Sequence, residues 1–216
     1  MSLIWKDHFT KYLTMQRNYK IFTADILEKI INSNKKEIQL INYYLKKTPL
    51  KVLDIGCGIG IYDLALHDFY KKNIIFYLLD KTTTPDEEKK IYYGYREKGS
   101  FYNNLDYTQD FLVSNGIDEK NLHLISVDNN IDITNQYLQN NLTNIDLIIS
   151  IISCGFHYPI KIYLDTIHKI LDNNGILCLH CRNIPENLPL LESKFNILWP
   201  EKEGIREGSF LICNKK

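Results

Sequence analysis

The stretch that decides the fold is Lys51-Val52-Leu53-Asp54-Ile55-Gly56-Cys57-Gly58-Ile59-Gly60, or KVLDIGCGIG. A short apolar run carries an aspartate near its end and then passes into three glycines at alternate positions. The apolar run predicts a buried strand. Glycines directly after such a strand let the backbone approach a ligand closely and let the next helix start tightly. The stretch therefore predicts a ligand-binding turn at the carboxyl end of a strand.

Further apolar runs follow this stretch, and amphipathic stretches separate them. The runs lie at 74–80, 122–128, 145–153 and 175–181, and the helix-like stretches at 60–70, 104–115, 131–140, 159–172 and 186–194. This alternation predicts a parallel sheet with helices on both faces. Two final runs, 195–201 and 208–215, are joined by a short turn region and predict an antiparallel hairpin at the edge of the sheet.

Two segments lie outside this alternating pattern. Apolar stripes with helical spacing run through 3–18 and 21–45, so we expect extra N-terminal helices and divide the chain into a helical cap, 1–48, and a main domain, 49–216. The stretch 81–103 is polar and rich in tyrosine. The sequence leaves open whether either segment forms a lid, an interface of a homodimer or a simple surface excursion.

The overall composition narrows the classes of partner and compartment. The 216 residues hold 26 basic and 26 acidic side chains, which disfavours a long nucleic-acid footprint. No apolar run reaches the ~18–20 residues of a membrane-spanning helix. Charges at Lys6, Asp7 and Lys11 interrupt any signal-peptide core. Five scattered cysteines suit a reducing cytoplasm, so we expect a cytoplasmic protein without membrane insertion.

Cys178 and Cys181 form a C-x-x-C motif inside one of the apolar runs. Positions three apart in a strand point to opposite faces of the sheet, whereas a zinc or redox pair needs converging sulfurs. We therefore expect buried core cysteines and no metal site.

Three kinds of ligand are held at turns like the one after Ile55. The dinucleotide fingerprint requires glycine or alanine where this chain has Ile61, and the phosphate-binding P-loop requires a Lys-Ser/Thr pair that does not follow. Asp54 would repel a pyrophosphate, but it suits a cationic ligand such as S-adenosylmethionine, which carries an ammonium and a sulfonium group. The turn thus favours S-adenosylmethionine over a phosphate ligand.

At these residues the sequence resembles the class I S-adenosylmethionine-dependent methyltransferases. The first motif of that family, D-x-G-x-G-x-G after a strand, matches 54–60 without a gap, and acids follow the next two predicted strands as Asp80 and Asp128. The resemblance implies a Rossmann-like, seven-stranded, mostly parallel α/β sheet. It also implies a cofactor site made of Asp54, Gly56, Cys57, Gly58, Gly60, Asp80, Lys81, Asp128, Asn129 and Ser150. In that site Asp80 would bind the ribose and Asp128 would touch the adenine.

The segment 150–159 follows the fourth strand, where this family holds the reacting methyl group. It contains no Pro-Pro, no Pro-Cys and no acid, which disfavours the amino-directed nucleic-acid, the cytosine-C5 and the catechol-type metal enzymes, respectively. A hydroxyl acceptor usually needs a base. We expect His157 as general base, His180 as the second choice, and Tyr158 as a group that orients the substrate.

The predicted activity is methyl transfer from S-adenosylmethionine to a hydroxyl of a small polar acceptor, such as a saccharide, with S-adenosylhomocysteine as product. Two alternatives stay open: N-methylation of a protein or an RNA, and a non-catalytic subunit that binds the donor as a scaffold. A nicotinamide-dependent oxidoreductase is disfavoured by Asp54 and Ile61.

Overall fold

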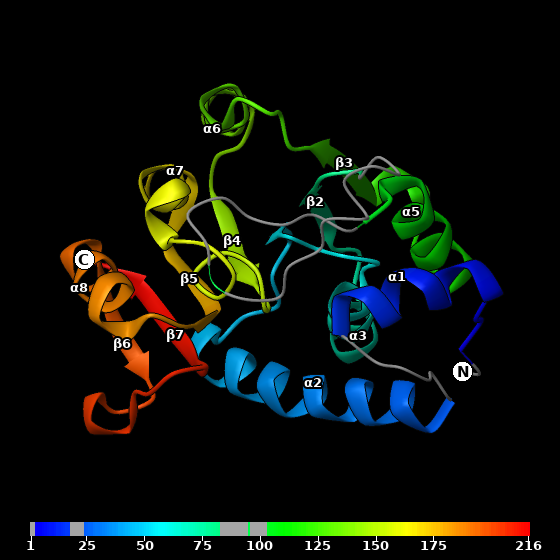
Figure 1. Cartoon of the computed structure of the whole chain (residues 1–216), viewed down its shortest axis with the longest axis horizontal. Helices are drawn as coiled ribbons and strands as arrows, with labels where there is room; N and C mark the ends of the chain where they lie inside the picture. Colours follow the sequence, from blue (N-terminus) through cyan, green and yellow to red (C-terminus); the bar gives the residue numbers. More distant parts are fainter. Residues whose placement is uncertain (1–2, 18–23, 83–94, 96–102) are drawn as a thin grey trace.

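A single mixed sheet organises the molecule (Figure 1). The structure, a computed structural model, describes residues 3–17, 24–82, 95 and 103–216. The strands in the described part are β1 (Lys51–Ile55), β2 (Ile75–Asp80), β3 (Leu122–Ser126), β4 (Ile145–Ser150), β5 (Leu171–Cys181), β6 (Phe195–Trp199) and β7 (Ser209–Lys215). Their order is β3-β2-β1-β4-β5-β7-β6. Strands β1 to β5 pair in parallel, whereas β7 runs antiparallel to both β5 and β6. The predicted sheet and its antiparallel C-terminal hairpin are confirmed.

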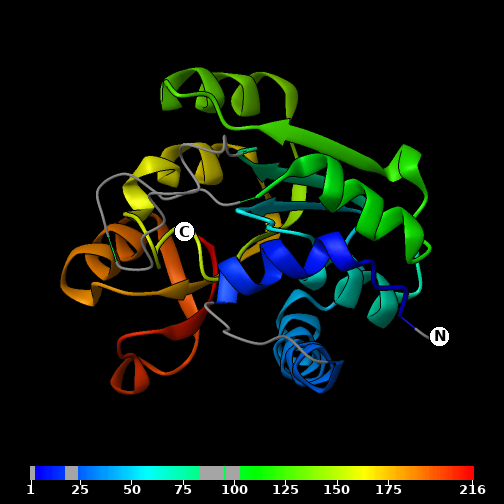
Figure 2. The same ribbon diagram turned by 45° about the vertical axis from the view of Figure 1, so that its right-hand side comes forward.

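Helices cover both faces of this sheet, as Figures 1 and 2 show. The α-helices in the described part are α1 (Asp7–Arg17), α2 (Ala24–Leu45), α3 (Ile61–Tyr70), α5 (Leu105–Ser114), α6 (Ile131–Asn141), α7 (Leu164–Ile170) and α8 (Ile184–Lys194). Short 3-10 turns lie at Glu119–Asn121, Ile160–Ile162 and Lys202–Gly204. Helices α1, α2, α3 and α5 pack on one face, and α6, α7 and α8 on the other.

Two hydrophobic cores result, because successive residues of each strand point to opposite faces. In β1, Val52 enters the core with α2 and α3, and Leu53 enters the core with α6 and α7. Ile38 and Ile41 of α2 are fully buried in the first core. Helix α2 therefore shares a core with the sheet, and the division of the chain at residue 48 stays a prediction.

The cysteines lie in these cores. Cys178 faces the first core and Cys181 the second, as the strand geometry predicts. All five cysteines are buried free thiols. Among the described residues no group of three or more His, Cys, Asp or Glu side chains could hold a metal ion.

The parallel strands bring their carboxyl ends to one edge of the sheet. Ile55, Asp80, Ser126, Ser150 and Cys181 end β1 to β5 at that edge. Ligands of open α/β sheets bind beyond this edge. In the part of the chain that the structure describes, no helix combines the length and apolar character needed to cross a bilayer.

Candidate functional site

The turn after β1 depends on its glycines. Gly56, Gly58 and Gly60 have φ of 81°, 57° and 81°, a left-handed backbone that other residues adopt only with strain. A Cβ atom at Gly56 would lie 1.9 Å from Oγ of Ser153. The N–H of Gly56 donates to the carbonyl of Leu79 at 2.7 Å, which ties the turn to β2.

Asp80 closes this turn from the neighbouring strand. Its Oδ2 accepts from the N–H of Gly58 at 2.8 Å, and its Oδ1 accepts from the N–H of Lys81 at 2.7 Å. The side chain is 7% exposed, and burial raises the pKa of the carboxyl to about 6 although these N–H groups oppose the rise. The structure therefore brings together two parts of the predicted site, the glycine turn and the acid that ends β2.

Asn103 completes this cluster and was missed from the sequence. Its Nδ2 donates to the carbonyl of Gly58 at 2.7 Å and to Oδ2 of Asp80 at 3.3 Å. Thr108 of α5 donates to the same carbonyl at 2.7 Å. Asn103 is 1% exposed. The sequence signal was weak: two asparagines precede a helix, and such residues ordinarily act as caps.

Asp63 is the second residue that the sequence did not reveal. It lies in the first turn of α3 and is fully buried, and its carboxyl group lies beside that of Asp54, which is 2% exposed. Burial, reinforced by the neighbouring Asp63, raises the pKa of Asp54, and burial also raises the pKa of Asp63. Two buried carboxyl groups this close share a proton, because both cannot ionise together at low cost.

The loop after β3 lies beside the loop after β2. Nζ of Lys81 donates to Oδ1 of Asn129 at 3.1 Å. Asp128 is exposed, and its Oδ1 accepts from the N–H of Asn130 at 2.8 Å. These predicted ligands of the ribose and the adenine thus lie at the same edge as the glycine turn.

Two further predicted cofactor ligands are buried. Ser150 donates to the carbonyl of Ile55 at 2.9 Å and accepts from the N–H of Cys154 at 2.8 Å, so its hydroxyl joins β1 to the turn after β4. Cys57 is 8% exposed, and burial raises the pKa of its thiol. We expect an uncharged thiol at Cys57.

The turn that follows β4 carries two of the predicted catalytic residues. Tyr158 is 4% exposed, its hydroxyl lies 3.1 Å from Oγ of Ser153, and burial raises the pKa of its phenol. His157 is 8% exposed, and its backbone N–H donates to the carbonyl of Ser153 at 2.8 Å. Both side chains are buried; Ser153 connects Tyr158 to the glycine turn, and the His157 ring packs against Phe156.

His180 occupies a more open position near the end of β5. Its Nε2 lies 3.1 Å from Oε1 of Glu37 on α2, and the two side chains are 16% and 21% exposed. A cavity of about 220 Å³ adjoins the pair. The cavity is lined by Lys29, Ile30, Ser33, Asn34, Glu37, Ile151 and His180.

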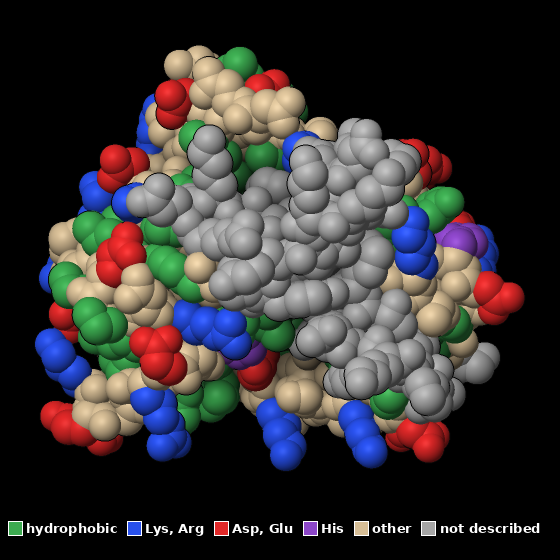
Figure 3. Space-filling view, viewed as in Figure 1, with side chains coloured by type: hydrophobic (Ala, Val, Ile, Leu, Met, Phe, Trp, Pro, Cys, Tyr) green, Lys and Arg blue, Asp and Glu red, His purple; other side chains and the backbone are tan. Residues whose placement is uncertain are grey.

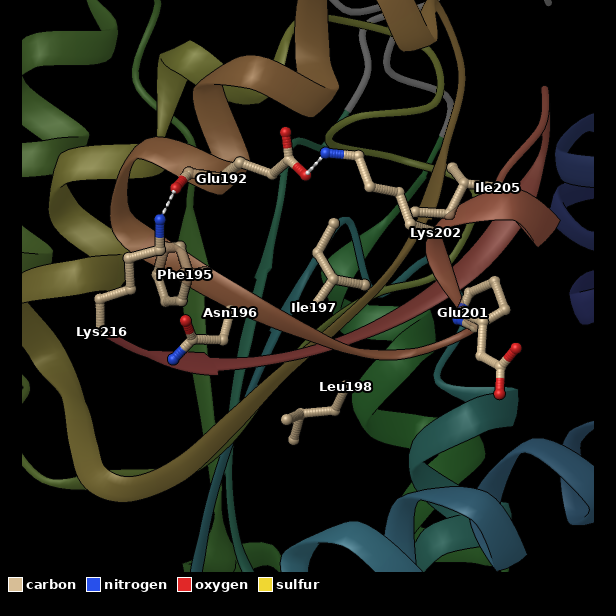
Figure 4. Close-up of a pocket in the computed structure, with 10 residues that line it drawn as sticks. Glu192, Phe195, Asn196, Ile197, Leu198, Glu201, Lys202, Ile205 and Lys216 are labelled. Carbon is tan, nitrogen blue, oxygen red and sulfur yellow. Dashed lines mark hydrogen bonds and ion pairs between the residues drawn. The ribbon is translucent and has the colours of Figure 1, made fainter.

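A larger cavity of about 550 Å³ lies along β6, at the edge of the sheet remote from β1 (Figure 4). Lys202 binds Glu192 at 2.7 Å on its wall, and Lys216 donates to the carbonyl of Glu192. None of the predicted site residues lines it.

The stretch 81–103 lies largely outside the described residues. Tyr95 is described, and its hydroxyl donates to Oε2 of Glu186 at 3.2 Å and accepts from Nδ2 of Asn187 at 3.2 Å, both in α8. The alternatives for this stretch, a lid or a surface excursion, remain predictions.

No protein-family model and no curated protein sequence matches the chain. Solved structures resemble it. An inferred S-adenosylmethionine-dependent methyltransferase from Methanococcus maripaludis matches with a TM-score of 0.56 at 14% identity over 100% of this chain and 97% of that one. A SAM-dependent methyltransferase from Aquifex aeolicus matches with a TM-score of 0.53 at 15% identity over 90% and 97%, respectively.

A protein from Nostoc punctiforme inferred to be an O-methyltransferase has a TM-score of 0.56 at 14% identity; the match covers 87% of this chain and 56% of that chain. Identities this low establish the fold alone. The chain has the Rossmann-like fold of the S-adenosylmethionine-dependent methyltransferases.

Proposed function

We propose that this chain is an S-adenosylmethionine-dependent methyltransferase that acts on a hydroxyl group of a small polar acceptor, such as a saccharide. The observation that carries the proposal is the buried cluster of Gly58, Asp80 and Asn103 at the carboxyl edge of the sheet. It combines a left-handed glycine turn with a fixed carboxylate, in a fold shared with methyltransferases.

The residues present fit this donor. A carboxylate offers about four acceptor positions, and the N–H groups of Gly58, Lys81 and Asn103 leave Asp80 with capacity for a ribose hydroxyl. Oδ1 of Asp54 is enclosed and accepts no hydrogen bond from an N–H or hydroxyl group of the described residues. The ammonium group of the donor would supply that missing partner.

Each predicted ligand then has a role. Asp54 and the backbone of Gly56, Cys57, Gly58 and Gly60 would hold the methionine end, Asp80 and Lys81 the ribose, and Asp128 and Asn129 the adenine. Ser150 would act indirectly, by fixing the turn that follows β4. When bound, S-adenosylmethionine supplies an electrophilic methyl group, and the protein contributes by positioning donor and acceptor.

Surface charge supports a small acceptor over a nucleic acid. The chain carries equal numbers of basic and acidic residues. On the face shown in Figure 3, Lys and Arg side chains are interspersed with Asp and Glu among the coloured residues. Among these coloured residues, the mixed charges form no continuous electrostatic track for a polyanion.

Calorimetry with S-adenosylhomocysteine tests the proposal. The wild type should bind the compound, and Asp80→Ala should weaken binding by at least about tenfold, or ~1.4 kcal/mol, because a charge-assisted hydrogen bond is lost. Asp68→Ala is the matched control. It removes an exposed aspartate near the C-terminal end of α3, away from the glycine turn, and this variant should bind S-adenosylhomocysteine normally. If the wild type does not bind S-adenosylhomocysteine, the proposed function is wrong.

A further inference from the structure

The small cavity beside α2 contains a histidine–carboxylate pair from distant parts of the chain. His180 of β5 and Glu37 of α2 are 143 residues apart in sequence and meet at 3.1 Å. The carboxylate accepts from Nε2, so the other ring nitrogen, Nδ1, is left as the acceptor of the neutral imidazole. A histidine held in this tautomer is prepared to take up a proton at Nδ1.

Polar groups that lack a partner gather around this pair. Nδ2 of Asn34, on the cavity wall, belongs to a side chain that is 5% exposed and has no hydrogen-bond partner among the described residues. Oε2 of Glu37 likewise accepts no well-formed hydrogen bond there, although the Tyr62 side chain lies nearby. Each such buried group costs about 1–3 kcal/mol when it is left unpaired. A bound molecule with its own donor and acceptor groups would satisfy both.

Tyr62 connects this cavity to the glycine turn. Its hydroxyl is enclosed without a well-formed hydrogen bond in the described part of the chain. Burial raises the pKa of Tyr62, and the charges of Glu37 and Asp54 add to the rise. Tyr62 therefore lies between Glu37 on the cavity wall and Asp54 of the proposed methionine site.

The cavity also lies at the edge of the sheet where the proposed donor site is. Ile151, on its wall, directly follows β4, and His180 is the penultimate residue of β5. The turn that begins at Ile151 packs on Gly56 through Ser153. The turn after β4 thus borders both the cavity and the glycine turn.

We propose that this cavity binds the methyl acceptor and that His180 takes the proton from the hydroxyl that is methylated. The proposal rests on the proposed methyltransferase function. Asn34 would donate a hydrogen bond to one oxygen of the acceptor, and Glu37 would accept one from a second hydroxyl. The volume of about 220 Å³ lies below the ~300 Å³ lower bound of ordinary ligand pockets, which limits the acceptor to a small molecule.

The proton and the electron pairs balance in this arrangement. The acceptor oxygen forms a bond to the methyl carbon while the bond from that carbon to sulfur breaks, and the hydroxyl proton passes to Nδ1 of His180. Glu37 keeps the hydrogen bond to Nε2 and stabilises the imidazolium, so it is a positioning residue. The proton then leaves to water, and the product is a methyl ether.

The test uses tritiated methyl groups. The protein is incubated with [methyl-³H]S-adenosylmethionine and the protein-free small-molecule fraction of a cell extract, and the initial rate of label transfer is measured. The variants are His180→Asn, Glu37→Gln and Glu37→Asp, of which only the last retains a carboxylate at position 37. His8→Asn is the matched control, because His8 forms a pair of the same 3.1 Å length with Asp110 far from the cavity.

We expect His180→Asn to lower the rate about 10²-fold, Glu37→Gln to lower it about tenfold, and Glu37→Asp to recover part of that loss. S-adenosylhomocysteine affinity, measured by calorimetry, should stay unchanged in all these variants. Asn34→Ala should raise the amount of extract needed for half-maximal rate.

Two results would overturn the acceptor site. One is a wild type that binds S-adenosylhomocysteine but transfers no label to this fraction, and the other is a His180→Asn variant as active as His8→Asn. A wild type that fails to bind S-adenosylhomocysteine would instead refute the proposed function itself.

Discussion

The carboxyl groups of Asp54 in β1 and Asp63 in α3 are buried next to each other, and the two residues flank the glycine turn in the sequence. Asp63 is fully buried and Asp54 is 2% exposed. The helix that follows the glycine turn thus places a second buried acid beside Asp54. The pair shares a proton near neutral pH, and this proton links the stability of the fold to pH.

The first prediction concerns that linkage. Burial raises the pKa of both carboxyls in the folded state, to about 7 for Asp63, so the fold favours their protonated forms. The stability they contribute is complete below about pH 4, where unfolded aspartate is protonated, and is lost as the pH rises through about 7. Unfolding by urea between pH 4 and 8 should show the free energy of unfolding falling over this range.

Asp63→Asn should flatten this dependence by up to ~1.4 kcal/mol per pH unit, the value for one proton. The variant should still show a smaller fall in the free energy of unfolding with rising pH, because Asp80 also has a pKa raised to about 6. Asp68→Asn, at a half-exposed site, is the control and should behave as the wild type. Equal slopes in Asp63→Asn and the wild type would show that the two acids do not share a proton.

The second prediction concerns Asn103, which holds the carbonyl of Gly58 and the carboxylate of Asp80 together. Asn103→Ala should weaken S-adenosylhomocysteine binding about tenfold, since it removes a hydrogen bond to a charged group worth ~1.5–3 kcal/mol. The adjacent Asn104 is the control, because its side chain caps α5 at the N–H of Asp106. Asn104→Ala should cost about 1 kcal/mol of stability and leave the affinity unchanged. Equal affinities in both variants would contradict the role of Asn103.

The third prediction concerns the turn itself. Gly56→Ala places a Cβ atom at φ 81° and 1.9 Å from Oγ of Ser153, so both strain and collision oppose it. We expect a loss of at least ~2 kcal/mol of unfolding free energy in urea. Adding Ser153→Gly should recover the part of the lost unfolding free energy that comes from the collision, and the part that comes from backbone strain should remain. Gly204→Ala, where the nearest atom is 3.6 Å away, should be nearly neutral.

The fourth prediction separates the two histidines. His157 is buried beside the edge of the Phe156 ring, whereas His180 borders the cavity. With His180 as the proton acceptor, His157→Asn should lower stability but keep label transfer within about threefold of the wild type. A loss of about 10²-fold in the rate, with S-adenosylhomocysteine binding retained, would make His157 the base and remove that role from His180.

The features that could be predicted are those that depend on short stretches of sequence. The strand order follows from short apolar runs that alternate with amphipathic ones, and the acid at the end of β2 follows from its place in that order. The role of Asp80 was assigned from the resemblance to the methyltransferase family, and the structure places its Oδ2 2.8 Å from the backbone nitrogen of Gly58.

The remaining part depends on tertiary contacts that no local pattern encodes. Asn103 meets Gly58 across 45 residues, and Glu37 meets His180 across 143. The hydroxyl of Ser150 likewise joins two backbone segments that are distant in sequence, and its predicted role at the cofactor site stays a prediction. Position in the chain indicates where a side chain is, and only its neighbours indicate what it binds.

Strand β7 lies between β5 and β6, although every other strand precedes it in the chain. During synthesis on the ribosome, the edge of β5 that pairs with β7 therefore stays unpaired until residues 209–215 have emerged. Exposed edges of this kind invite pairing with other chains. The yield of folded protein in the cell should thus depend on how quickly this final strand is delivered, or on chaperones that cover β5 in the meantime.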